Sequence, residues 1–205
     1  MLVPHYMRPT LLVCHHAFFR MTVMSDFRRW FVAGGTYFFT LVTYRRQPLF
    51  REQTAQNILG NCFRNVRDDL SFSIIAIVLL PDHLHIVMSL PAGDDDYSTR
   101  LKRIKRDFTV QWLESGGTEL PVTDSEKRRG QRGVWQSRFW EHVIRDETDL
   151  KHHADYIHYN PVKHGCATSP REWPASSFHR FVKLGEYPID WGRSEPATIQ
   201  GMNLE

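Results

Sequence analysis

The sequence of 205 residues lacks the features of several large protein classes. It has no apolar run that approaches the length of a membrane span, and the apolar piece at residues 11–14 is too short for the core of a signal peptide. Its three cysteines, Cys14, Cys62 and Cys166, have no CxxC spacing and are odd in number, which argues against a disulfide-built scaffold. These absences predict a cytoplasmic protein without a membrane segment.

The chain also lacks a strong excess of charge and a nucleotide-binding loop. Its formal net charge is +3 and its pI is about 8.8, which permits nucleic acid as a partner without demanding it. No Gly-rich phosphate-binding loop is present, so the sequence predicts no nucleotide cofactor. The hydrophobic fraction of 41% and the charged fraction of 24% are typical of a globular domain with a core.

The composition divides the chain into three parts. Residues 1–23 show no sustained hydrophobic period, so we expect an extension outside the fold, either disordered or added by a start codon placed too early. Residues 24–191 carry the domain. Within it, residues 115–133 are poor in hydrophobic residues and predict a flexible insertion. For residues 192–205 we expect a disordered C-terminal tail.

The hydrophobic periodicity predicts the order of the elements. Strands are expected at 36–44, 72–80 and 83–90 and within 134–144. Helices are expected at 52–68, from an N-cap at Ser98 onward, and from Asp146 to Asn160, where Pro161 should end the helix. Strand–helix–strand–strand–helix–strand is the split βαβ order. We therefore predict an α+β, ferredoxin-like fold with a mainly antiparallel sheet and helices packed on one face.

A pair of histidines lies on one of the predicted strands. Side chains alternate along a strand, so His83 and His85 share one face while Leu84 and Ile86 point to the other. Two imidazoles at this spacing can reach one metal ion. Taken alone, such a pair is more often structural than metal-binding.

The predicted helix 147–160 carries a polar stripe at His152, Tyr156 and Asn160, which are four residues apart. An amide oxygen can be the third ligand of a hard divalent ion, and a phenol can attack a phosphorus centre that the ion polarises. A free phenol has a pKa near ~10, so the attack needs a metal or a base. Tyr156 as an ordinary surface aromatic stays an alternative. Tyr159 is a competing nucleophile, about 60° away from the stripe by ideal helix geometry.

A dense group of basic residues follows Ser98 on the next predicted helix. Five bases within seven residues suit a phosphate-binding surface or a solvated helix face, and charge alone leaves both open. They are Arg100, Lys102, Arg103, Lys105 and Arg106.

Several segments resemble one known family. The motif from Pro81 to His85 resembles the His-hydrophobe-His motif of the HUH nucleases that use one tyrosine. Other segments resemble the REP-associated tyrosine transposases, and together they extend from about Met24 to Trp191. They are Arg28-Arg29-Trp30, Gly34–Thr40, Trp135–His142, His152–Ile157, Asn160–Gly165, Trp173-Pro174 and Ser177–Arg180.

The resemblance implies a metal-dependent DNA endonuclease and strand transferase. His83 and His85 would bind Mg²⁺ or Mn²⁺, with Asn160 at the position where relatives place a third ligand, often Gln. Tyr156 would attack a phosphodiester in single-stranded DNA, forming a 5′-phosphotyrosine and releasing a 3′-OH. A covalent link of this kind keeps the bond energy for rejoining, so no nucleotide cofactor is needed.

The resemblance also implies the DNA partner, a hairpin from a repetitive extragenic palindrome with a short single-stranded guide. The protein would act as a monomer or a homodimer. The candidate DNA-binding residues are Arg28, Arg29, Gly34, Gly35, Arg103, Arg106, Arg138, His179 and Arg180.

Three alternatives stay open at this point. A catalytically silent protein could bind such hairpins without cutting them, and a hydrolytic metallonuclease could use metal-bound water in place of Tyr156. A rolling-circle initiator or relaxase would share the metal motif, but the sequence has no helicase or second domain.

Overall fold

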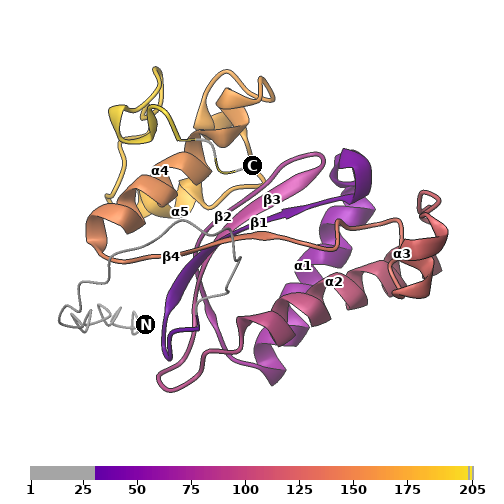
Figure 1. Cartoon of the computed structure of the whole chain (residues 1–205). Coiled ribbons are helices and arrows are strands. Elements are labelled where there is room, and N and C mark those ends of the chain that lie inside the picture. The colour runs from indigo at the N-terminus through magenta and orange to yellow at the C-terminus, as the bar shows by residue number, and fades with distance from the viewer. Residues whose placement is uncertain (1–30, 203, 205) are drawn as a thin grey trace, which may run out of the picture.

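The computed structural model describes residues 31–202 and residue 204. Within the described residues, no helix combines the length and the hydrophobicity that a membrane-spanning segment needs. The order of the strands and α-helices can be followed in Figure 1. They are β1 (Thr36–Val42), α1 (Gln53–Asp69), β2 (Ser73–Leu79), β3 (His83–Ser89), α2 (Tyr97–Glu114), α3 (Asp124–Arg128), β4 (Trp140–Val143), α4 (Glu147–Lys163) and α5 (Phe178–Lys183).

The four strands form one sheet in the order β2-β3-β1-β4, and all neighbours are antiparallel. Strand β3 lies between β1 and β2, which is the split βαβ arrangement. The predicted α+β, ferredoxin-like fold is therefore confirmed.

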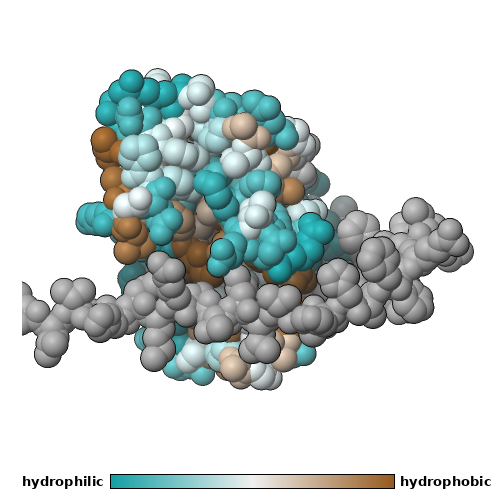
Figure 2. Space-filling model, turned by 90° about the vertical axis from the view of Figure 1, so that its left-hand side faces the viewer, coloured by the Kyte–Doolittle hydropathy of each residue, from teal (hydrophilic) through white to brown (hydrophobic). Residues whose placement is uncertain are grey.

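Figure 2 shows the side of the molecule on which β4 leads into α4 in Figure 1. The surface on this side is mainly hydrophilic, with smaller hydrophobic patches among the hydrophilic residues.

Helices cover both faces of the sheet. Helices α1 and α2 of the split βαβ unit share one face, as predicted, and α4 covers the opposite face (Figure 1). The alternation of β3 explains this arrangement, because Leu84 and Ile86 pack in the core with α1 and α2, while Val87 packs with Ala154 and Ile157 of α4. The histidines of β3 therefore face α4.

Helix α2 begins two residues earlier than expected. Its N-cap is Asp96, whose carboxylate accepts a hydrogen bond of 2.9 Å from the Thr99 amide. The predicted cap, Ser98, lies inside the first turn. Both side chains are good caps, but only the Asp96 carboxylate reaches a free amide of the first turn from outside the helix.

Helix α4 runs through Pro161 to Lys163, so the prediction that it ends at Asn160 is wrong. Proline has no backbone N–H, so the helix loses one hydrogen bond at Pro161. The helix nevertheless continues for about one more turn, to Lys163. That turn is closed by backbone bonds from His164 to the Asn160 carbonyl and from Cys166 to the Pro161 carbonyl. The extension matters because it brings Lys163 onto the same side of the helix as Tyr156.

Residues 115–133 are more structured than the expected flexible insertion. They contain α3, which starts with a capping box between Thr123 and Glu126. The guanidinium of Arg132 pairs with Glu119 at 2.6 Å, which ties the two ends of the segment together. Local capping and pairing thus replace the hydrophobic contacts that the segment lacks.

The C-terminal tail, expected to be disordered, packs on α4 and on the sheet in the residues that the structure describes. Ile199 is buried, and the Thr198 hydroxyl donates a hydrogen bond of 2.7 Å to the buried Asp155 carboxylate. The Leu204 carbonyl accepts a hydrogen bond from Thr40 of β1. A buried carboxylate needs such partners, and they come from sequence-distant positions. The predicted extension at 1–23 lies outside the described residues.

A buried histidine on α4 gives the fold a defined response to acid. His158 is fully buried, and burial, with a smaller contribution from the charge of Arg180, lowers its pKa to about 3. An unfolded histidine titrates near ~6.5, so the unfolded state binds the proton first. The contribution of His158 to the free energy of unfolding should therefore be fully present above pH ~6.5. It should decrease by about 1.4 kcal/mol per pH unit between that value and the folded pKa.

Urea unfolding at neutral pH and at about two units lower measures this slope. His158→Gln should remove the contribution of one histidine from it, whereas His179→Gln, an exposed control on α5, should leave it unchanged. Equal slopes in the two variants would contradict the assignment.

Candidate active site

Strand β3 holds His83 and His85 rigidly on the face that α4 covers. It is a central strand, with Val42 and Thr40 of β1 opposite the two histidines. Both imidazoles are almost completely buried, at 1% and 0% exposure. The backbone therefore fixes the two side chains before any ligand arrives.

Hydrogen bonds to the Nδ1 atoms set the tautomers of the two imidazoles. The Thr40 hydroxyl donates to the Leu204 carbonyl, so its oxygen accepts from the His85 Nδ1–H, 2.8 Å away. The His83 Nδ1–H donates to the Asp82 carboxylate at 2.6 Å. Each Nε2 is then left with a free lone pair, which is the form that binds a metal.

Four polar atoms around this point are buried without a hydrogen-bond partner among the described residues. They are the Nε2 atoms of His83 and His85 and both amide atoms of Asn160. An unpartnered buried polar atom costs about 1–3 kcal/mol, so the arrangement favours a ligand. Two imidazole nitrogens and an amide oxygen fit a divalent ion.

Helix α4 brings Asn160 to the histidine pair. One turn before it, the Tyr156 ring lies 5.3 Å from the His85 ring, and one turn after it, the His164 ring lies 5.1 Å from the His83 ring. Residues four apart on a helix share a face, so Asn160 lies on the side of α4 that faces both histidines.

The electrostatics of the site favour neutral imidazole and ionised carboxylate. Burial, followed by the charges of His83 and His164, holds the pKa of His85 well below its ordinary value. Burial alone would raise the pKa of Asp82, but hydrogen bonds from His83 and Arg46 outweigh it and the pKa is lowered. Asp82 therefore stays charged and orients His83.

Tyr156 lies directly against this donor set. Its hydroxyl is 3.2 Å from the Lys163 ammonium, which also lies 4.7 Å from the centre of its ring. The Leu204 amide donates to the same hydroxyl at 3.4 Å. The competing Tyr159 lies instead toward the chain at Gly192, so the geometry favours Tyr156 over Tyr159.

Comparison with known proteins identifies the family. The family model described as "Transposase IS200 like" matches residues 31–160. The chain belongs to this IS200-like transposase family. The predicted transposase enzyme is thereby confirmed.

Individual relatives of this IS200-like transposase place it more narrowly. A Haemophilus influenzae protein assigned as a REP-associated tyrosine transposase is 41% identical over 183 residues, covering 87% of this chain and 99% of that one. The REP-associated tyrosine transposase of Escherichia coli K12 is 43% identical over 169 residues, covering 82% and 91%. A solved structure of a REP-associated tyrosine transposase bound to a REP hairpin superposes with a TM-score of 0.67 at 39% identity, covering 88% and 99%.

The residues predicted to bind DNA lie in several separate parts of the structure. Arg28 and Arg29 lie outside the described residues. Gly34 has a φ of 69°, and a Cβ at Gly35 would come within 2.7 Å of the Val32 carbonyl oxygen, so the turn before β1 requires both glycines for its own geometry.

The basic candidates on helices already have partners within the chain. On α2, Arg103 pairs with Asp69 and Arg106 with Asp107, on the face of the sheet opposite Tyr156. On α5, the guanidinium of Arg180 donates to the Ile74 and Ile75 carbonyls of the edge strand β2.

Two further candidates, Arg138 before β4 and His179 on α5, are exposed. That any of these residues contacts DNA remains a prediction.

Of the five basic residues between positions 100 and 106, Arg100 is buried and hydrogen-bonded to Asp94, so its role is structural.

The sequence reasoning missed four contributors to the site, namely Thr40, Asp82, Lys163 and Leu204. Asp82 had a readable signal, since a carboxylate beside a metal-binding histidine often orients it. Lys163 was hidden by the expectation that α4 ends at Asn160. Thr40 and Leu204 have no local signal, because β-sheet register and tail packing bring them to the site.

Proposed function

We propose that the chain cleaves and rejoins hairpin-forming single-stranded DNA, with Tyr156 as the nucleophile and His83, His85 and Asn160 as the ligands of Mg²⁺ or Mn²⁺. The observation that carries the proposal is the set of buried, unpartnered imidazole and amide atoms next to the Tyr156 ring. The named relatives support the substrate, since one of them is a REP-associated tyrosine transposase bound to a REP hairpin.

In the proposed reaction, the Tyr156 oxygen attacks the phosphorus of a phosphodiester. A bond forms between phosphorus and the phenol oxygen, the bond to the 3′ oxygen breaks, and the 3′ oxygen takes up a proton as the phenol loses one. When bound, the divalent ion supplies polarisation of the phosphate and charge neutralisation. Attack of a 3′-OH on the phosphotyrosine reverses these steps and joins the strands.

The residues of the chain prepare this attack. Lys163, 3.2 Å from the phenol oxygen, stabilises the negative charge that develops on it or on the phosphate oxygens. Thr40 and Asp82 hold the imidazoles of His85 and His83 in the ligand tautomer. Because Tyr156 is only 1% exposed, the groups packed on it must move before DNA can reach the phenol, and the Leu204 amide, 3.4 Å from the hydroxyl, is one of them.

The test uses a hairpin DNA with a single-stranded foot, labelled at either its 5′ or its 3′ end, with Mn²⁺. A 5′-phosphotyrosine predicts that the 3′ label becomes bound to protein and resists SDS, while the 5′ label is released on a fragment with a 3′-OH. A hydrolytic metallonuclease would cut without any protein-bound label and leave a free 5′-phosphate. A silent hairpin-binding protein would shift the DNA on a native gel and leave it uncut.

A further inference from the structure

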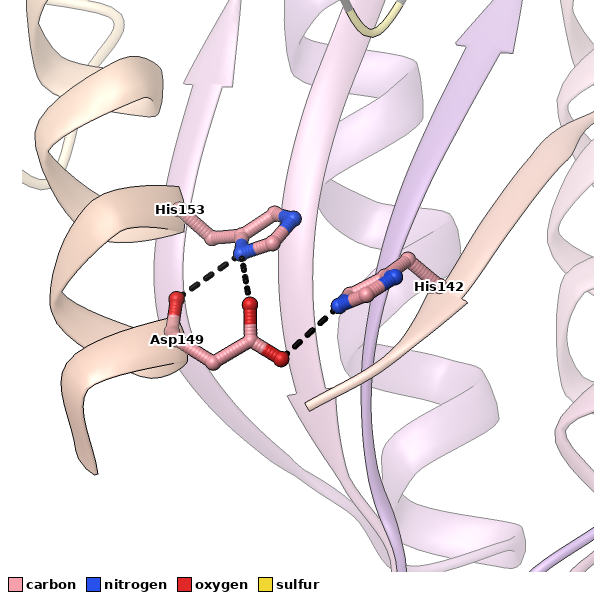
Figure 3. A group of neighbouring side chains, drawn as sticks. All are labelled: His142, Asp149 and His153. Atoms are coloured by element: carbon pink, nitrogen blue, oxygen red, sulfur yellow. Dashed lines mark hydrogen bonds and ion pairs between the residues drawn. The ribbon is translucent and has the colours of Figure 1, made fainter. Parts of the chain in front are cut away.

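A second group of metal-binding side chains lies away from the histidines of β3. His142 of β4 and Asp149 and His153 of α4 point toward one another (Figure 3). Among the residues that the structure describes, they form the one group of three His, Cys, Asp or Glu side chains whose ligand atoms all lie within 4.8 Å of one another. We propose that this cluster binds a transition-metal dication such as Zn²⁺, independently of the proposed nuclease site.

The local fold holds the three residues together. His142 is near the end of β4, and only three residues separate that strand from α4. Asp149 and His153 are four apart on α4 and therefore share a face. The N-cap Asp146 accepts a hydrogen bond of 2.8 Å from the Asp149 amide, which fixes the first turn of the helix beneath the cluster.

The donor atoms are close to the spacing that a metal imposes. The His142 Nε2 lies 2.8 Å from one Asp149 oxygen, and the His153 Nδ1 lies 3.1 Å from the other. A tetrahedral zinc ion with bonds of ~2.0–2.2 Å separates its ligand atoms by roughly 3.4 Å. The two imidazole–carboxylate distances therefore need to lengthen by only a few tenths of an ångström, and the two imidazole nitrogens, within 4.8 Å of each other, close toward the same separation.

The kind of donor selects the kind of metal. Two imidazole nitrogens and one carboxylate oxygen suit Zn²⁺ and its transition-metal neighbours, whereas Mg²⁺ and Ca²⁺ prefer oxygen donors. On binding, the His153 Nδ1 gives up its hydrogen bond to the Asp149 carbonyl, but that carbonyl keeps the helical bond from the His153 amide.

An open cavity of about 710 Å³ gives access to the cluster, and its lining includes all three residues together with Arg145 and His152. The space admits the ion and leaves room for water as a further ligand. The guanidinium of Arg145 lies 3.3 Å from the Asp149 carboxylate, but its side chain is 74% exposed and can turn into solvent when a dication binds.

The cluster is separate from the histidine pair of β3, because the Phe38 ring lies between them. Its centre is 4.9 Å from the His153 ring and 5.5 Å from the His85 ring. A metal bound at the cluster would join β4 to α4 three residues before Tyr156. It would thereby hold the helix of the nucleophile against the edge of the sheet.

Zinc binding to the full-length protein tests the proposal without any measurement of activity. The protein is freed of metal with a chelator, and Zn²⁺ is titrated by equilibrium dialysis in the presence of excess Mg²⁺. In a background of His83→Ala with His85→Ala, we expect one equivalent of Zn²⁺ that is lost on adding His142→Ala or His153→Ala. Zinc held elsewhere in the chain remains in all variants and cancels in this difference.

The controls separate ligand loss from misfolding. His152→Ala removes a histidine that lines the same cavity and should keep the equivalent of zinc. His142→Gln can still donate a hydrogen bond to Asp149, so it should fold, as judged by urea unfolding, and still lose the zinc. If the background variant binds no more zinc than its His142→Gln derivative, or if His152→Ala loses the same equivalent, the cluster is only a hydrogen-bonded contact between β4 and α4.

Discussion

Replacing Tyr156 with phenylalanine should abolish the covalent protein–DNA adduct, lowering its rate of formation by a factor on the order of 10³ or more. The change removes the one oxygen that can attack from this position. The phenyl ring should keep its packing on Phe38 and His85, whose rings lie 6.1 Å and 5.3 Å away. The adduct is measured with the 3′-labelled hairpin after denaturation in SDS.

The matched control for this variant is Tyr159→Phe, which makes the same chemical change one turn of backbone away. It should retain the adduct, because Tyr159 lies toward Gly192 and away from the histidines. Hairpin binding should be similar in both variants, since neither removes a charge. An adduct that persists in Tyr156→Phe would place the nucleophile elsewhere.

Replacing His85 with alanine should lower metal-dependent cleavage by a factor on the order of 10² or more while leaving hairpin binding mostly intact. The variant loses one of the two Nε2 ligands. It also opens a cavity beside Phe38 and Tyr156, with a cost to stability of roughly 2–4 kcal/mol. Cleavage is measured with Mn²⁺, and Mn²⁺ affinity is measured separately by calorimetry.

A second substitution separates the loss of the ligand from the loss of packing. His85→Phe keeps a buried aromatic ring but has no lone pair to offer, so it should lose cleavage as His85→Ala does while retaining more of the stability. Cleavage that survives in both variants would mean that His83 and His85 are structural residues of β3.

Much of the fold was predictable because its signals are local. The alternation from His83 to Met88 assigns each side chain to its face, and the structure places Leu84 and Ile86 in one core and Val87 in the other. The capping box of Thr123 and Glu126 is also a local signal, but the prediction of a flexible insertion overlooked it and missed α3.

The errors arose where tertiary contacts outweigh local preference. Helix α4 continues past Pro161 because one lost hydrogen bond costs less than the packing and capping that its last turn gains. The tail is ordered at Thr198 and Leu204 because Asp155 and Thr40, far away in sequence, supply their partners. The tail has no periodicity of its own from which this could be deduced.

The central position of β3 in the sheet has a consequence for the timing of local opening. Its amides are protected on both sides by β1 and β2, so in hydrogen–deuterium exchange they should be among the last to exchange, through global unfolding. Leu204 is held by hydrogen bonds to the Thr40 and Tyr156 hydroxyls, and its amide should exchange through small local openings. We therefore expect the Leu204 hydrogen bond to the phenol to break many times for each opening of β3, while the imidazoles keep their places.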